Sequence, residues 1–161
     1  MSKDECRSAN WREVGYHDGV KGLARSRVED HSEACAEAGV AVDRPAYFEA
    51  RERGIRAYCV APNGMNVGRS GESYRDVCPP ELEPAFLYQY RMGYAVYAAE
   101  QRVSQLDSEQ RDLEARLRKA DKDTDRAKLR DRLRDLDHDL RRARDELGWR
   151  QADAMRAGGQ P

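Results

Sequence analysis

The apolar positions of the chain fall into two patterns that meet near residue 100. In the first part, short amphipathic stretches alternate with glycine, proline and capping residues, as is typical of a small helical domain. Asn10 can cap the first helix, Gly39 can end the second, and Pro45 stands in the first turn of the third. The pattern predicts four short helices, over residues 10–22, 27–38 and 45–58 and from about residue 80 onward.

Residues 60–80, between the third and fourth helices, contain three prolines and three glycines. This composition predicts an irregular loop, with a short hairpin at best. Tyrosine and arginine are side chains that favour interfaces, so the loop is the best candidate for a binding surface. The candidate residues of that surface are Asn63, Asn66, Arg69, Tyr74 and Arg75.

The second part of the chain has the 3–4 spacing of coiled-coil core positions. Two such runs are out of phase with each other, and the break lies in residues 119–126. They form either an antiparallel hairpin or one unbroken helix of about 65 residues that pairs with another chain. The expected core leucines are Leu106, Leu113, Leu117, Leu129, Leu133, Leu136, Leu140 and Leu147.

These patterns divide the chain into a helical domain over residues 1–100, a coiled-coil-like arm over 101–152 and a disordered tail over 153–161. A weak internal repeat lies within the first of these regions. Ala46-Tyr47 is followed by Gly54, and Ala85-Phe86 is followed by Gly93 at the same offset. Glycine weakens a helix interior, so its recurrence predicts that two helices lie in close contact at these points.

Charge excludes several classes of protein. The 161 residues hold 29 Lys and Arg and 30 Asp and Glu, a net charge of −1. A globally basic nucleic-acid binder and a polyacidic tail are therefore excluded, and no stretch is apolar enough for a membrane span. Charged residues make up 37% of the chain, well above the usual 25% or so, which predicts a thin core.

Four cysteines allow three disulfide pairings. If the first two helices form an antiparallel hairpin, Cys6 lies beside Cys35, and the same relation between the third and fourth helices places Cys59 beside Cys78. We therefore predict the disulfides Cys6–Cys35 and Cys59–Cys78, each contributing about 3 kcal/mol to stability. A zinc site with His31 and Cys35, four residues apart, and free thiols are the alternatives, although no Cys-x-x-Cys knuckle is present.

Disulfides indicate an oxidising compartment, but the printed sequence has no signal peptide. Cys6 does not fit a lipid-attachment cysteine, because charged residues precede it. An export signal upstream of the printed residues is compatible with both observations.

No catalytic motif stands out. His17 and Asp18 are adjacent, so they do not share a helix face, and a catalytic histidine needs its orienting acid within hydrogen-bond reach. Ser70 lacks the strand that precedes a nucleophile elbow. For each of these, a structural role is the better interpretation, and we expect no enzymatic activity, no cofactor and no metal.

Several motifs carry a family resemblance over residues 5–97. They are Trp11-Arg-Glu-Val-Gly-Tyr-His-Asp-Gly-Val-Lys-Gly22, His31-x-x-x-Cys35, Gly39-Val-x-Val-Asp43, Tyr47-x-x-x-Arg51-x-x-Gly54-Ile-x-x-Tyr58-Cys59, Gly68-Arg-Ser-Gly71-x-x-Tyr74-x-x-Val77-Cys78-Pro79, and Leu82-Glu83-x-x-Phe86-x-x-x-Tyr90. In this order and spacing they resemble the bacterial lipoprotein family known as domain of unknown function 2799. The resemblance implies an exported protein of the Gram-negative envelope, with a lipidated cysteine upstream, and it implies no activity.

The sequence thus predicts an all-α, disulfide-stapled domain with a long charged helix or helical hairpin. We expect a periplasmic protein, lipid-anchored to the outer membrane, that binds a protein partner or itself through the arm and binds no nucleic acid. The alternative is a module for cell-wall glycan or another small ligand in the first domain. Tyrosines that could line a groove for it are Tyr16, Tyr88, Tyr90, Tyr94 and Tyr97.

Overall fold

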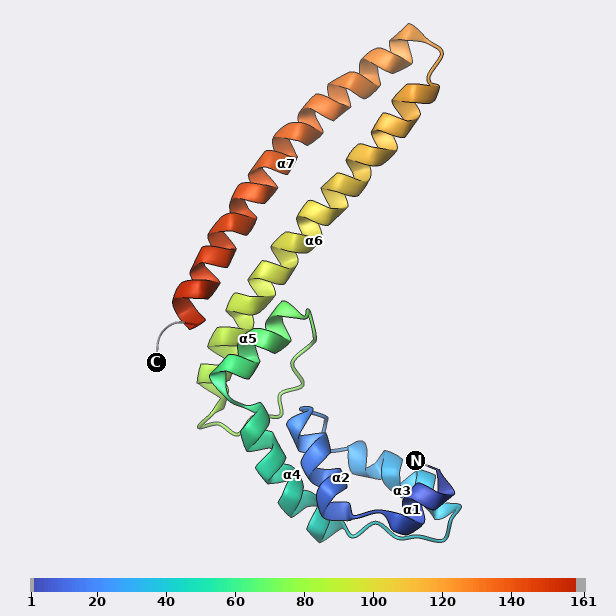
Figure 1. Ribbon diagram of the computed structural model, residues 1–161, viewed down its shortest axis with the longest axis vertical. Coiled ribbons are helices and arrows are strands. Elements are labelled where there is room, and N and C mark those ends of the chain that lie inside the picture. The colour runs from blue at the N-terminus through green and yellow to red at the C-terminus, as the bar shows by residue number, and fades with distance from the viewer. Residues whose placement is uncertain (1, 159–161) are drawn as a thin grey trace.

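The computed structural model describes residues 2–158, and in that range the chain forms seven α-helices and no strand. A long hairpin of two helices extends away from a base of shorter helices (Figure 1). The all-α prediction is confirmed. The helices are α1 (Lys3–Ser8), α2 (Trp11–Val20), α3 (Arg27–Ala36), α4 (Arg44–Tyr58), α5 (Ala61–Arg69), α6 (Glu83–Lys119) and α7 (Asp123–Gly158).

The base helices begin at the residues whose side chains can cap them. Asn10 accepts a hydrogen bond from the Arg12 backbone N–H at the start of α2, and Asp43 accepts one from Ala46 at the start of α4. These bonds satisfy backbone donors that a helix leaves free at its first turn. The short helix α1 was not predicted. It opens with a capping box between Ser2 and Glu5.

The prediction of an irregular loop over residues 60–80 is wrong for its first half, because residues 61–69 form α5. Pro62 lies in the first turn, where a missing N–H costs nothing. Gly64 and Gly68 are buried against α6. Here the glycines permit a close helix contact, and burial outweighs their low helix propensity. Residues 70–82 are irregular, as expected.

Two helix pairs, α2 with α4 and α5 with α6, pack backbone against backbone. A Cβ atom added to Gly19 would lie 2.3 Å from the carbonyl oxygen of Arg51, and one added to Gly68 would lie 2.2 Å from that of Tyr90. Real Cβ atoms do not approach backbone so closely. The close helix contact that the repeated glycine predicted is therefore present in both pairs.

The two helix pairs are copies of one structural unit. The Arg51 guanidinium donates to the carbonyl oxygen of Leu23 at 2.5 Å, and at the matching place the Tyr90 hydroxyl donates to that of Glu72 at 3.0 Å. The difference in residue number between matched positions is the same throughout a given helix. The internal repeat therefore extends over both helices of the pair. The matched positions include Gly15 and Gly64, Gly19 and Gly68, Gly22 and Gly71, Tyr47 and Phe86, Gly54 and Gly93, and Tyr58 and Tyr97.

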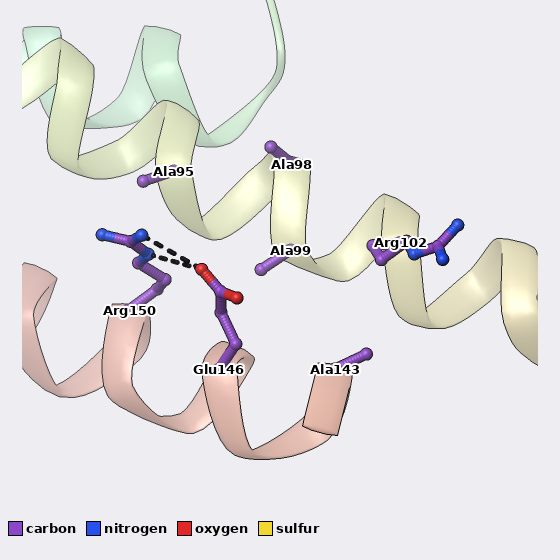
Figure 2. A pocket seen from close by; sticks show the side chains of 7 residues that line it. All are labelled: Ala95, Ala98, Ala99, Arg102, Ala143, Glu146 and Arg150. Carbon is purple, nitrogen blue, oxygen red and sulfur yellow. Dashed lines mark hydrogen bonds and ion pairs between the residues drawn. The ribbon is translucent and has the colours of Figure 1, made fainter. Parts of the chain in front are cut away.

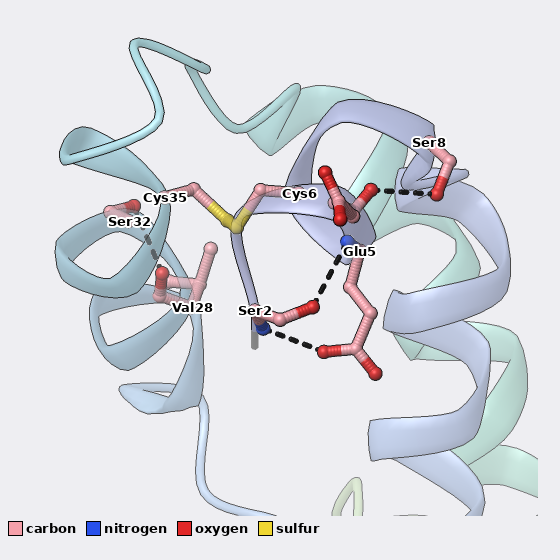
Figure 3. Close-up of a disulfide and its surroundings, with 8 residues drawn as sticks. Ser2, Glu5, Cys6, Ser8, Val28, Ser32 and Cys35 are labelled. Carbon is pink, nitrogen blue, oxygen red and sulfur yellow. Dashed lines mark hydrogen bonds between the residues drawn. A yellow bond between two sulfur atoms is a disulfide. The ribbon is translucent and has the colours of Figure 1, made fainter.

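The structure contains both disulfides at the pairings expected from the sequence, Cys6–Cys35 and Cys59–Cys78. Figure 3 shows the first, which joins α1 to α3. The helix arrangement assumed for these pairings is wrong, however, because α2 packs on α4 and not on α3. Each disulfide instead ties the chain that enters the first helix of a pair to the chain that enters the second. All four cysteines are oxidised, so the zinc and free-thiol alternatives do not apply to them.

Helices α6 and α7 form an antiparallel hairpin, joined by residues 120–122 (Figure 1). The alternative of one unbroken helix is therefore wrong. The leucine stripes of the two helices bury each other, which removes the need for a second chain to cover them. Within residues 2–158 no helix has the length and apolar character needed to cross a membrane. The core holds Leu106, Leu113, Leu136 and Leu140, with Val103, Leu129, Leu133 and Ala143 packed against it, and Leu117 and Leu147 are half-buried.

Two predicted boundaries are wrong. The one at residue 100 lies inside α6, which belongs to a helix pair at its start and to the hairpin at its end. The tail predicted from residue 153 is helical up to Gly158, and residues 159–161 lie outside the described part of the chain. Helix α7 continues because Ala154 and Ala157 are buried and the amide of Gln89 donates to the carbonyl oxygen of Ala157 at 2.7 Å.

Candidate functional site

The five residues predicted to form a binding surface point to different places. The side-chain amide of Asn63 donates to the carbonyl oxygen of Tyr58 at 2.8 Å, so it closes the bend between α4 and α5. Asn66 is exposed on α5. Arg69 lines a hollow shared with the end of α7, where Met155 also lies. Asn63 therefore has a structural role, whereas Asn66 and Arg69 are both exposed on α5.

The other two members of that set also have structural partners. Tyr74 is half-buried, its ring lies 5.2 Å from that of Phe86, and its hydroxyl donates to Glu83 at 2.8 Å. Arg75 donates to the carbonyl oxygen of Gly22 at 3.4 Å. Three of the five residues thus have structural hydrogen bonds, and a binding surface in the loop 60–80 stays a prediction.

The five tyrosines considered for a groove are divided as well. Tyr90, Tyr94 and Tyr97 follow one another along α6, with ring centroids 5.9 and 5.8 Å apart. Tyr97 covers Gly71. Tyr16 lies on α2 and Tyr88 is on α6, and both are exposed.

A buried polar cluster that the sequence analysis missed joins α2, α3 and α4. The Nε2 atom of His31 lies 2.8 Å from Asp18 Oδ2, and the Tyr47 hydroxyl donates to the same oxygen at 2.7 Å. Only 7–8% of Asp18 and His31 is exposed, and Tyr47 is fully buried. The three residues are far apart in sequence. The available signal was the position of Asp18 on the glycine face of α2, three residues after Gly15 and four before Gly22.

The electrostatics of this cluster follow from its burial. Burial is the largest of the effects that raise the pKa of Tyr47, and the neighbouring Asp18 carboxylate raises this pKa further. The phenol therefore remains a hydrogen-bond donor at any physiological pH. Arg51, one helical turn along α4, is 4% exposed, and burial lowers its pKa.

An open groove of about 550 Å³ is lined by residues of α1, α2 and α3 and of the segment between α1 and α2. His31 and Asp18 of the cluster are among its lining residues, and most of the others are polar residue types. The Ser8 hydroxyl donates to the carbonyl oxygen of Asp4 at 3.0 Å, a bond within its own helix turn. The lining residues are Glu5, Ser8, Ala9, Asn10, Glu13, Val14, His17, Asp18, Lys21 and His31.

The remaining candidates for chemistry have ordinary structural roles. Ser70, considered as a nucleophile from sequence, donates to the carbonyl oxygen of Val67 at 2.9 Å at the end of α5. His17 is exposed on α2. Among residues 2–158 no group of three or more His, Cys, Asp and Glu side chains is placed to hold a metal ion.

The hairpin arm has a groove of its own, of about 360 Å³, between α6 and α7 near the base. Figure 2 shows Ala95 and Ala99 of α6 across from Glu146 and Arg150 of α7, which form an ion pair of 3.0 Å. Trp149 follows Glu146 by three residues, which places it on the same side of α7, and it is 70% exposed.

Comparison with known proteins identifies one family. The family described as "Protein of unknown function (DUF2799)" matches residues 10–95, a range that covers α2 to α5, the first part of α6 and both cysteines of the second disulfide. No curated protein and no solved structure matches the chain. The motif residues Asp18, His31 and Tyr47, which carry the sequence resemblance, form the buried cluster. The chain belongs to the DUF2799 family of proteins of unknown function.

Proposed function

We propose that this protein is a non-catalytic component of the cell envelope that binds a protein partner through its hairpin arm. The observation that carries the proposal is Trp149, which is 70% exposed on α7 and follows the groove residue Glu146 by three positions. Exposed tryptophan is uncommon on a charged helix, and tryptophan is enriched among residues that dominate interface energies. Small side chains across the groove allow a partner's backbone or side chain to approach closely.

The internal packing of the arm supports this role. Because its leucine stripes already cover each other, the arm can extend from the base as a rigid monomeric element (Figure 1). Ion pairs cross the hairpin, including Arg132 with Glu109 at 2.8 Å and Arg144 with Asp107 at 3.0 Å. The outer faces are then free to bind a partner.

The two disulfides support the periplasmic location that we propose. Anchoring to the outer membrane by a lipid is part of the same proposal. Structural disulfides form and persist in oxidising compartments. The test is the intact mass of the protein isolated from its native cells and alkylated under denaturing conditions. We expect no label before reduction and four labels after it. Four labels before reduction would contradict an exported protein.

The interaction role is tested by site-specific photo-crosslinking in intact cells that export the protein. A photoreactive side chain is placed at Trp149, at Arg141 elsewhere on the arm, and at Arg53 in the base. We expect one discrete product from position 149, and its loss when Ala99→Arg fills the groove. A product with twice the mass of the chain would identify the partner as a second copy. A discrete product from Arg53 alone would move the interaction to the base and contradict the proposal.

A further inference from the structure

The internal repeat allows the buried cluster to be compared with a second version of itself. The position of Asp18 on α2 corresponds to Val67 on α5, and that of Tyr47 on α4 corresponds to Phe86 on α6. His31 corresponds to Tyr74, because each precedes the second cysteine of its disulfide by four residues. Each also packs its ring on the matched aromatic side chain, His31 at 5.9 Å from Tyr47 and Tyr74 at 5.2 Å from Phe86.

The second unit shows which side chains the packing of a helix pair requires and which are particular to the first unit. In the second unit, Val67 and Phe86 belong to an apolar core with Tyr58, and the helices pack as closely as in the first. The helix pair therefore forms without a buried carboxylate. Burying Asp18 and His31 carries a desolvation cost that an apolar pair of similar volume avoids. Packing alone does not explain why the first unit has these side chains.

What the cluster adds is an oriented imidazole at the floor of the groove. A carboxylate oxygen accepts hydrogen bonds, so Nε2 of His31 donates to Asp18, and in the tautomer that carries its proton on Nε2 the Nδ1 atom is an acceptor. The side chain is 8% exposed, and it lines the groove. Nδ1 has no hydrogen-bond partner among residues 2–158, and it is not among the fully enclosed atoms that lack one. Nδ1 therefore keeps hydrogen-bonding capacity that no group of the described residues uses.

The charge of the groove indicates which ligand would use this acceptor. Glu5, Glu13 and Asp18 contribute three carboxylates, against one lysine, Lys21. We propose that the groove binds a small ligand that carries a protonated primary amine, which donates to His31 Nδ1 and to the Glu13 carboxylate. A cation is attracted by the net negative lining, and an ammonium group supplies three donors and no acceptor. This site is separate from the arm, so its test is independent of the proposed interaction role.

The test uses the three histidines of the chain as reporters. His17 and His31 line the groove, whereas His138 lies on α7 in the arm. The imidazole resonances of the oxidised protein are followed by NMR during titration with 1,4-diaminobutane. We expect saturable shifts of the His17 and His31 signals, an unmoved His138 signal, and no shift with 1,4-butanediol. The diol keeps the chain length and removes the charge.

Two variants give a matched control that does not disturb the buried cluster. Glu13→Gln removes one carboxylate of the groove, and we expect affinity for the diamine to fall about tenfold, the effect of one charge-assisted hydrogen bond. Glu114→Gln makes the same change on an exposed position of the arm, and we expect it to leave binding unchanged. Equal shifts of all three histidines, equal binding by Glu13→Gln, or no saturable shift in the millimolar range would each overturn the proposal.

Discussion

The sharpest prediction concerns Gly19, where α2 lies against α4. A Cβ atom at this position would lie 2.3 Å from the carbonyl oxygen of Arg51 and 2.8 Å from the backbone nitrogen of Ile55. Both neighbours are backbone atoms, so no side-chain rotation relieves the contact. Gly19→Ala therefore forces the two helices apart by about 1 Å, which disrupts the packing of a close-packed interior.

The expected magnitude combines two opposing effects. Overpacking of this kind costs up to about 3 kcal/mol, and replacing a helical glycine by alanine returns about 1 kcal/mol. We therefore expect Gly19→Ala to lower the free energy of unfolding by about 2 kcal/mol. For a chain of this size, that corresponds to a melting temperature about 4–8 °C lower. The matched residue of the second unit, Gly68, has the same surroundings and should show a similar loss.

The assay is thermal and urea denaturation followed by circular dichroism, with both disulfides intact. Gly148 provides the control, because it lies inside α7 and a Cβ atom there meets nothing within 4 Å. Gly148→Ala should stabilise the protein by up to about 1 kcal/mol, from helix propensity alone. If Gly19→Ala proved as stable as Gly148→Ala, the close contact between α2 and α4 would be refuted.

Three further predictions address other parts of the fold. Replacing Cys59 and Cys78 by serine removes a cross-link over a 19-residue separation and should cost about 3 kcal/mol in urea denaturation. Leu140→Ala should cost about 2–5 kcal/mol by the same measurement, because this side chain is 1% exposed in the hairpin core. The third concerns buried phenols: the pKa of Tyr47 is raised, and burial raises that of Tyr74 to about 12. Because these values exceed the unfolded one, the stability is fully present below about pH 10 and is lost as pH rises toward 12. A pH titration that follows helicity together with tyrosinate absorbance should show both changes in that window, and full ionisation of the folded protein near pH 10 would refute it.

Much of the fold was readable from local sequence, because local interactions determine those features. Asn10 caps the helix that it was expected to cap, and α4 begins where Pro45 was expected in its first turn, since both signals act only within one turn. The leucine spacing predicted the hairpin core, and the out-of-phase runs located its turn. The cysteine pairing was also inferred, although the helix arrangement behind it was wrong.

Other features were decided only by tertiary contacts. Residues 61–69 are rich in helix-breaking residues, and they form α5 because α6 accepts their glycines at backbone distance. Residue composition changes at 100, yet α6 continues through that point, because one face packs on α5 and another on α7. Local propensity could not reveal either result, since the stabilising contacts come from distant residues.

The candidate site depends on tertiary contacts more than any other feature of the chain. Asp18, His31 and Tyr47 are far apart in sequence, and no spacing pattern connects them. By itself, the sequence indicated most of the helices, the cysteine pairing and the family that the chain resembles, but not α1 or α5. Only the tertiary structure decided which polar groups meet, because α3 and α4 must first pack on α2 before their side chains can share one carboxylate oxygen.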